Sequence, residues 1–143
     1  MKKNILVTGG SGFIGSAIVK YLVRNKHNVI VLDNNSRGRS RRIEEVRNEI
    51  KFIKGDIRNK TKLLSIHNKI DTVIHLAYVN GTKHFYKKPY EILDIAVNGL
   101  LNILEFCRHK KVKNFFLASS SEVYQNPLKF PTNEMEMLKI PDI

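Results

Sequence analysis

The chain has 143 residues, 42% hydrophobic and 27% charged, which fits one soluble globular domain with a single core and excludes an intrinsically disordered protein. Its net charge of +12 would suit nucleic-acid binding, but the lysines are scattered and no nucleic-acid-binding signature accompanies them, so we expect no nucleic-acid partner. No apolar run could span a bilayer, and the N-terminus passes directly into a predicted strand without room for a signal peptide, so we expect a cytoplasmic protein without membrane contact.

Residues 2–8 form a predicted apolar strand that leads into three spaced glycines and then into a helix. Gly9 can form the tight turn, Gly12 lets the backbone approach a pyrophosphate, and Gly15 lets the helix pack closely on the sheet. The helix N-terminus offers free N–H groups and a positive dipole end to phosphates. The apolar stripe of this helix is predicted to comprise Ile14, Ala17, Ile18, Tyr21 and Leu22. A dinucleotide site is therefore predicted here, against the alternative of a glycine-rich turn without a ligand.

A second strand, predicted over residues 28–32, ends on Asp33, whose carboxylate could accept hydrogen bonds from the hydroxyls of an adenosine ribose. The dense basic cluster that follows, residues 37–42, is either a solvated loop and helix start or an aid to binding an anionic cofactor or substrate. Asp33 would repel a 2′-phosphate and so favours NAD over NADP, although Arg37 could receive that phosphate.

The rest of the chain continues to alternate helix and strand. The predicted elements are a short basic helix over 40–48, a strand over 50–54, a helix over 59–67 with Asn59 as N-cap, a strand over 71–76, a loop over 78–88, a long helix from Pro89, and a strand over 113–118. The buried face of the long helix is predicted to hold Ile92, Ile95, Ala96, Gly99, Leu100, Ile103 and Cys107. On such a face Cys107 is expected to be a core residue rather than a nucleophile.

This alternation predicts an α/β fold, a doubly wound parallel sheet with strand order 3-2-1-4-5. The order reverses between the first and fourth strands, so a ligand crevice is expected where residues 9–15 and 77–80 meet. The histidines, acidic residues and single cysteine lack metal-ligand spacing, and no metal site is predicted.

The run from Thr8 to Gly15, T-G-x-x-G-x-x-G, resembles the extended branch of the short-chain dehydrogenase/reductase superfamily, which holds the nucleotide-sugar epimerases, dehydratases and decarboxylases. Leu32-Asp33-Asn34 resembles that family's ribose-binding segment and Gly55-Asp56-Ile57 its adenine-binding segment. His75-Leu76-Ala77 resembles the end of its fourth strand, and the run from Ser119 to Tyr124 resembles its serine/threonine segment.

The resemblance implies a Rossmann-like fold, NAD as cofactor, a nucleotide-sugar substrate that is transiently oxidised at a hydroxyl, and a homodimer for the full-length form. The cofactor-binding residues that it implies are Gly9, Gly12, Phe13, Ile14, Gly15, Asp33, Asn34, Asp56, Ile57, Leu76, Ala77 and Tyr78.

The family's catalytic Y-x-x-x-K motif does not occur, since none of the five tyrosines is followed by lysine four residues later. By the family's pattern the motif should follow shortly after residue 143, so we expect residues 1–143 to be an incomplete NAD(P)-binding Rossmann domain. It would be truncated after its fifth strand, lack a substrate domain and be inactive alone. The resemblance implies catalytic roles for Ser120, Ser121 and Glu122, where Ser120 occupies the position of the catalytic serine or threonine.

Two alternatives stay open. An acidic residue at Glu122 favours a dehydratase or decarboxylase over an epimerase, unless this carboxylate simply faces solvent. The chain could also be a non-catalytic dinucleotide-binding regulatory protein; Ser120 favours the enzyme, and the missing tyrosine–lysine pair would favour the regulator only if the natural protein ends at Ile143.

Overall fold

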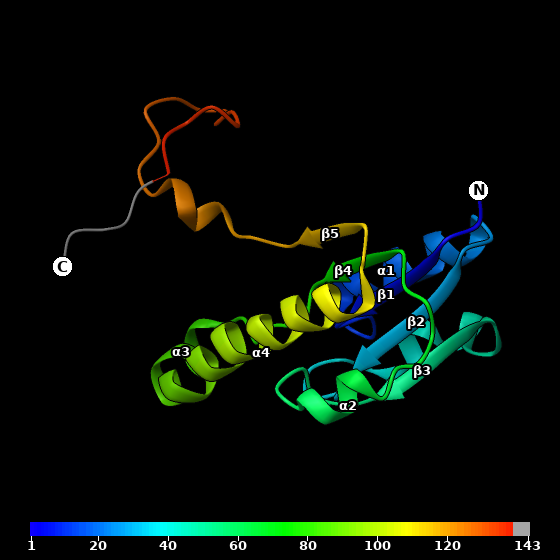
Figure 1. The fold of residues 1–143 in the computed structure, drawn as a ribbon. Coiled ribbons are helices and arrows are strands. Elements are labelled where there is room, and N and C mark those ends of the chain that lie inside the picture. Colours follow the sequence, from blue (N-terminus) through cyan, green and yellow to red (C-terminus); the bar gives the residue numbers. More distant parts are fainter. Residues whose placement is uncertain (139–143) are drawn as a thin grey trace.

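The computed structural model describes residues 1–138, and its central element is a sheet of five parallel strands (Figure 1). The strands are β1 (Asn4–Thr8), β2 (Asn28–Asp33), β3 (Ile50–Lys54), β4 (Thr72–His75) and β5 (Asn114–Leu117). Their order is β3-β2-β1-β4-β5, and all four neighbouring pairs are parallel, so the predicted topology is confirmed.

The helical segments are α1 (Phe13–Arg24), η1 (Ser40–Glu49), α2 (Lys60–Leu64), α3 (Thr82–Lys87), α4 (Pro89–Lys110) and η2 (Ser121–Tyr124). Asn59 caps α2 as predicted, since its side chain accepts a hydrogen bond of 2.9 Å from the Lys62 N–H, but the helix ends earlier than expected. Segment η1 is a 3₁₀ helix, in which residues three apart share a face; its two buried residues are Ile43 and Val46. The predicted loop over 78–88 contains α3, which has no apolar periodicity to reveal it.

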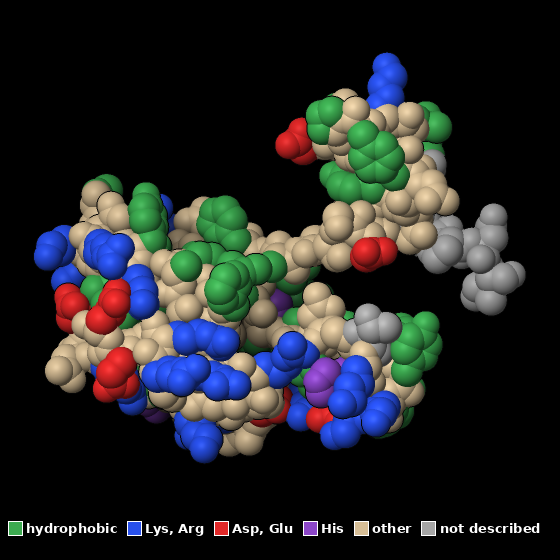
Figure 2. Space-filling view, turned by 180° about the vertical axis from the view of Figure 1, so that it is seen from behind, with side chains coloured by type: hydrophobic (Ala, Val, Ile, Leu, Met, Phe, Trp, Pro, Cys, Tyr) green, Lys and Arg blue, Asp and Glu red, His purple; other side chains and the backbone are tan. Residues whose placement is uncertain are grey.

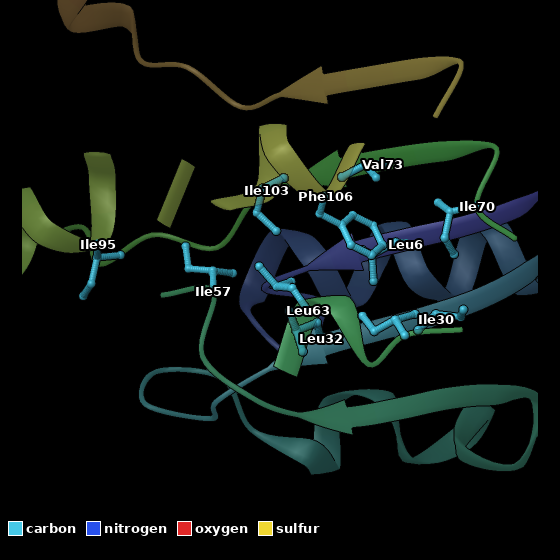
Figure 3. Close-up of a cluster of buried hydrophobic side chains, with 11 residues drawn as sticks. Leu6, Ile30, Leu32, Ile57, Leu63, Ile70, Val73, Ile95, Ile103 and Phe106 are labelled. Atoms are coloured by element: carbon cyan, nitrogen blue, oxygen red, sulfur yellow. The ribbon is translucent and has the colours of Figure 1, made fainter. Parts of the chain in front are cut away.

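Side chains that alternate along the strands fill two cores, one on each face of the sheet. On the first face Leu6, Ile30 and Val73 pack with α2 and α4, and Ile103 and Phe106 of α4 are almost completely buried (Figure 3). The second core contains residues of α1 and η1 packed on the opposite face of β1 and β2. The central strands β1, β2 and β4 are therefore covered on both faces, as a buried parallel sheet requires.

The predicted apolar stripe of α1 is largely wrong. Ile14 and Tyr21 are 64% and 66% exposed, and Ala17 also faces solvent. The buried residues of the helix are Gly15, Ser16, Val19, Leu22 and Val23. The reason is steric: Gly15 must lie against the glycine turn, where a Cβ would stand only 2.2 Å from the Gly9 carbonyl oxygen, and this contact fixes which face of α1 meets the sheet.

The long helix α4 buries the face predicted for it, with Ile92, Ile95, Gly99 and Ile103 inside and Phe106 in addition. Its Ala96, Leu100 and Cys107 are half-buried, and burial raises the pKa of the Cys107 thiol to about 11, so this thiol stays protonated at neutral pH.

Strand β5 forms one edge of the sheet, and the chain beyond it extends away from the body (Figures 1 and 2). Phe116 and Leu117 are 60% and 50% exposed, while Phe115 packs partly against the first core. The arm, residues 118–138, carries exposed apolar side chains such as Leu128 and Phe130. Within residues 1–138, no helix combines the length and apolar character needed to cross a bilayer.

Candidate functional site

The turn between β1 and α1 is built so closely that only glycine fits at two of its positions. Gly9 has a φ of +73°, and a Cβ on it would lie 2.9 Å from the Ala77 nitrogen. Its carbonyl accepts the Gly12 N–H at 3.0 Å, and the same oxygen excludes a side chain at Gly15. The turn therefore places the start of α1 directly against the ends of β1 and β4.

The N-terminus of α1 has the features of an anion site. Gly12 caps the helix without a side-chain hydrogen bond, and the first turn contains no acidic residue. The N–H groups of Phe13 and Ile14 precede the first intrahelical bond, which runs from the Ser16 N–H to the Gly12 carbonyl. Among the described residues 1–138 these N–H groups have no acceptor, so a twelve-residue helix presents free donors and the positive end of its dipole beside the turn.

Asp33, at the end of β2, is 8% exposed and is held by two main-chain donors. Its Oδ2 accepts the Ser11 N–H at 2.9 Å and its Oδ1 accepts the Asn35 N–H at 2.8 Å. A Cβ on Gly38 would stand 1.9 Å from the Ser11 hydroxyl, so the loop after β2 folds directly over this carboxylate. Each oxygen keeps lone-pair capacity for a further donor such as a ribose hydroxyl.

The loops after β2 and β4 are connected by Arg37, whose guanidinium donates to the Asn80 carbonyl. Arg37, the first residue of the basic cluster, is exposed, lines the cleft and is held by this main-chain acceptor. The Arg37 guanidinium therefore lies against the loop that follows β4.

Asp56, after β3, accepts four hydrogen bonds that fill both of its oxygens. Arg58 provides three, from its main-chain N–H and from Nε and Nη2, at 2.9 to 3.0 Å, and the Asn34 amide provides the fourth at 3.0 Å. The Arg58 side-chain hydrogen bonds are the main reason that the pKa of Asp56 falls to about 2. Next to this carboxylate, the Ile57 N–H has no acceptor within residues 1–138.

The end of β4 is fixed by Thr8. Its hydroxyl oxygen accepts the N–H groups of Leu76 and Ala77 at 3.2 and 3.3 Å and lies 2.7 Å from Nδ1 of His75. The Leu76 N–H is shared with the Thr8 carbonyl oxygen at 3.1 Å, whereas the Ala77 N–H points at the hydroxyl oxygen. The hydroxyl proton is therefore directed to Nδ1, which leaves the His75 ring neutral with its proton on Nε2. Burial lowers the pKa of His75 to about 4. His75 therefore acts as a fixed acceptor within the sheet.

Together these segments border one cleft at the carboxyl ends of the strands. Of the predicted cofactor residues, the cleft is lined by Gly9, Gly12, Asp33, Asn34, Asp56, Ile57, Leu76, Ala77 and Tyr78. Phe13, Ile14 and Gly15 do not line it; the first two side chains are 82% and 64% exposed, and Gly15 lies under the turn.

The cleft wall also contains Leu32, Ser36, Arg37, Gly38, Gly55, Val79 and Ile95. Most of them stand in segments that the sequence had indicated. Leu32 and Gly55 belong to the two segments that resemble nucleotide-binding ones, Val79 to the expected crevice, and Arg37 and Gly38 to the basic cluster. Ser36 and Ile95 carried no such signal, since Ile95 resembles any core residue of a helix.

The predicted catalytic residues lie elsewhere. Ser120, Ser121 and Glu122 are exposed on the arm and do not line the cleft. The Ser120 hydroxyl accepts the Glu122 N–H at 3.3 Å and so caps η2. Within residues 1–138, no group of three or more His, Cys, Asp or Glu side chains could hold a metal ion.

Comparison with known proteins gives a consistent result. The sequence profile described as the NAD dependent epimerase/dehydratase family matches residues 5–141. A UDP-N-acetyl-alpha-D-glucosaminuronate decarboxylase from Bacillus cytotoxicus is 40% identical over 124 residues, which are 87% of this chain and 38% of that protein. A UDP-glucose 4-epimerase from Klebsiella pneumoniae is 37% identical over 133 residues, 89% of this chain and 96% of that protein.

A solved structure extends the comparison to the fold. The UDP-glucose 4-epimerase from Brucella ovis in complex with NAD superimposes with a TM-score of 0.85 at 29% identity, covering 96% of this chain and 42% of that one. The chain thus spans about two fifths of the length of the Bacillus and Brucella proteins.

Proposed function

The chain belongs to the NAD-dependent epimerase/dehydratase family, and from this we propose that the cleft at the carboxyl ends of β1, β2, β3 and β4 binds NAD. The observation that carries the proposal is the arrangement of the cleft itself. It combines an uncompensated helix N-terminus for the pyrophosphate, a buried carboxylate for a ribose, and a paired acceptor and donor for a base. These three features follow one another in the order of the groups in a dinucleotide.

Adenine is the base that the end of β3 would recognise. Its N1 accepts a hydrogen bond and its 6-amino group donates one, which complements the adjacent Ile57 N–H and Asp56 carboxylate. The Asp56 oxygens are already filled, and the Asn34 amide is the one donor that comes from outside residues 55–58. We propose that the 6-amino group takes the place of this amide when adenine binds.

Asp33 favours NAD over NADP. A 2′-phosphate beside the buried carboxylate would place like charges a few Å apart, which costs on the order of a few kcal/mol in a partly buried site. The cation that could offset this repulsion, Arg37, bonds to the Asn80 carbonyl.

The test is calorimetric titration of the chain with NAD and with NADP. We expect NAD to bind about tenfold or more tightly, and the preference to disappear in Asp33→Asn, which removes the charge. Equal or tighter binding of NADP by the unaltered chain would contradict the assignment of Asp33, and failure to bind either dinucleotide would contradict the proposed function.

A nucleotide sugar is the proposed substrate class, because the relatives described above are enzymes named for UDP-sugars. This favours an enzymatic role over a regulatory one.

We further propose that Ser120, Ser121 and Glu122 belong to the reaction centre of the complete active site. The chain of 143 residues has no Y-x-x-x-K to supply an activated tyrosine, and its Ser120 lies outside the cleft, so we propose that it performs no sugar oxidation alone. Since NAD and nucleotide sugars are intracellular metabolites, we propose a cytoplasmic location.

We propose that the protein forms a homodimer through the outer face of α4. Four apolar side chains at helical spacing, Leu93, Val97, Leu101 and Leu104, are 42% to 61% exposed there. Such a stripe on an amphipathic helix is typical of a face that packs against another helix, and the same face of a second copy would satisfy it symmetrically.

Leu101→Glu should abolish this association, because it places a charge at the centre of the stripe. Thr61→Glu, an equal charge on the exposed part of α2, is the matched control. In sedimentation velocity at micromolar concentration we expect a dimer for the unaltered chain and the control, and at least about tenfold weaker association for Leu101→Glu. A dimer that survives in Leu101→Glu would show that another face is used.

A further inference from the structure

Residues 55–58, here called the base-reading loop, are fixed by three contacts from the inner face of α4. Asp94 accepts a hydrogen bond of 3.0 Å from the Arg58 guanidinium, which is the same group that holds Asp56. The Asn102 amide donates to the carbonyls of Ile57 and Arg58 at 3.2 and 2.9 Å.

The third contact is steric. A Cβ on Gly99 would stand 2.4 Å from Cδ1 and 2.8 Å from Cγ1 of Ile57. Ile57 is 5% exposed and lines the cleft, so a side chain at position 99 would displace a residue of the cleft wall (its place among the buried residues is shown in Figure 3). Gly99 lets α4 approach the base-reading loop, and Asn102 sets the direction of the peptide groups of that loop.

We propose that Asn102 and Gly99 of α4 are positioning residues for base recognition, and that the preference of the cleft for adenine depends on them. The inference rests on the proposed function, since it concerns the base of the dinucleotide. The Ile57 N–H and the Asp56 carboxylate must lie side by side to match the edge of adenine. Asn102 and Ile57 are 45 residues apart in the sequence. The peptide groups of the base-reading loop are therefore oriented by a tertiary contact with α4, since the loop has no helix or strand of its own.

The two hydrogen bonds of Asn102 do more than hold the helix to the base-reading loop. One amide nitrogen serves two successive carbonyls, which fixes the orientation of both peptide planes. The peptide plane between Ile57 and Arg58 carries the first carbonyl together with the Arg58 N–H that donates to Asp56. Loss of the amide therefore frees the rotation of the peptide that holds the carboxylate.

The experiment compares NAD with nicotinamide hypoxanthine dinucleotide by calorimetry. Hypoxanthine carries an N–H at N1 and a carbonyl at position 6, so its edge opposes that of adenine and meets a donor with a donor and the carboxylate with an oxygen. For the unaltered chain we expect NAD to bind about tenfold or more tightly. In Asn102→Ala we expect this ratio to fall by at least about threefold, and in Asn28→Ala, which removes an exposed amide at the start of β2, we expect it to stay unchanged.

Gly99→Ala tests the same proposal without removing a hydrogen bond, and it decides the matter if Asn102→Ala does not fold. The ratio is the decisive quantity, because a variant that is merely less stable weakens both ligands equally. An unchanged ratio in the folded variants would overturn the inference and leave the proposed function intact. Failure of the unaltered chain to bind NAD, or an absence of preference between the two dinucleotides, would overturn both the base assignment and the inference.

Discussion

Replacing Gly15 by alanine should destabilise the fold by about 3 kcal/mol or more and abolish NAD binding. The added methyl would stand 2.2 Å from the Gly9 carbonyl oxygen and 2.8 Å from the Gly10 Cα. All of these neighbours are backbone, so α1 itself would have to move away from the turn. The buried side of α1 contributes Val19, Leu22 and Val23 to the second core, and displacing the helix disturbs these contacts as well.

Gly12→Ala is the matched control, because its Cβ meets a single atom, the Gly9 oxygen, at 3.1 Å, and its φ of −68° suits any residue. We expect this variant to lose at most about 1 kcal/mol of stability, while NAD affinity falls by at least about tenfold because the methyl enters the cleft. Urea unfolding and calorimetry of both variants separate the two effects. Equal stability of Gly15→Ala and the unaltered chain would show that the turn is not as closely packed as described.

Lowering the pH from about 7 to about 4.5 should remove about 2–3 kcal/mol of stability through His75 alone. The pKa of His75 is lowered to about 4 in the folded chain, from 6.5, because the ring is buried. Protonation therefore favours the unfolded chain. The contribution is complete above about pH 6.5 and is lost progressively as the pH falls toward 4. Asp56, whose pKa is about 2, contributes in a separate and lower range of pH.

The check is the free energy of unfolding in urea at the two pH values. In His75→Gln, which retains an acceptor for the Thr8 hydroxyl but does not titrate, the pH dependence should shrink by about 2 kcal/mol. His67→Gln, which removes an exposed histidine, should leave it unchanged. A pH dependence that persists in His75→Gln would show that another group is responsible.

The sheet was predictable because its determinants are local or follow from general rules. Strand β3 was predicted with its observed bounds, and the order of the strands follows from the alternation of strands and helices. The face of α1 was not predictable, because its orientation is set by the contact of Gly15 with a carbonyl that only the folded turn brings near. The 3₁₀ form of η1 and the presence of α3 were not predicted either, because the short α3 has no apolar periodicity and the pattern of residues 40–48 indicates an ordinary helix.

For the candidate site, the motifs identified the segments but not their connections. Asp33 and Asp56 could be singled out from the sequence, yet the donors that hold them could not. Ser11 approaches Asp33 from the glycine turn, and Asn34 approaches Asp56 from the end of the neighbouring strand β2. Arg37 and Asn102 act on partners 43 and 45 residues away, and such contacts have no signature in spacing. The position of Ser120 on the arm likewise depends on how the chain leaves β5, which its hydroxyl-rich sequence does not specify.

The most direct measurement is a titration of the isotopically labelled chain with NAD, followed by two-dimensional NMR of the backbone amides. If the four segments form one dinucleotide site, the amides of Gly12, Ile57 and Ala77 should shift together with a single dissociation constant. Those at the amino ends of the strands, such as Lys3 and Asn28, should stay in place. Saturable shifts confined to the amino ends, or different dissociation constants at Gly12 and Ile57, would contradict a single NAD site in this cleft.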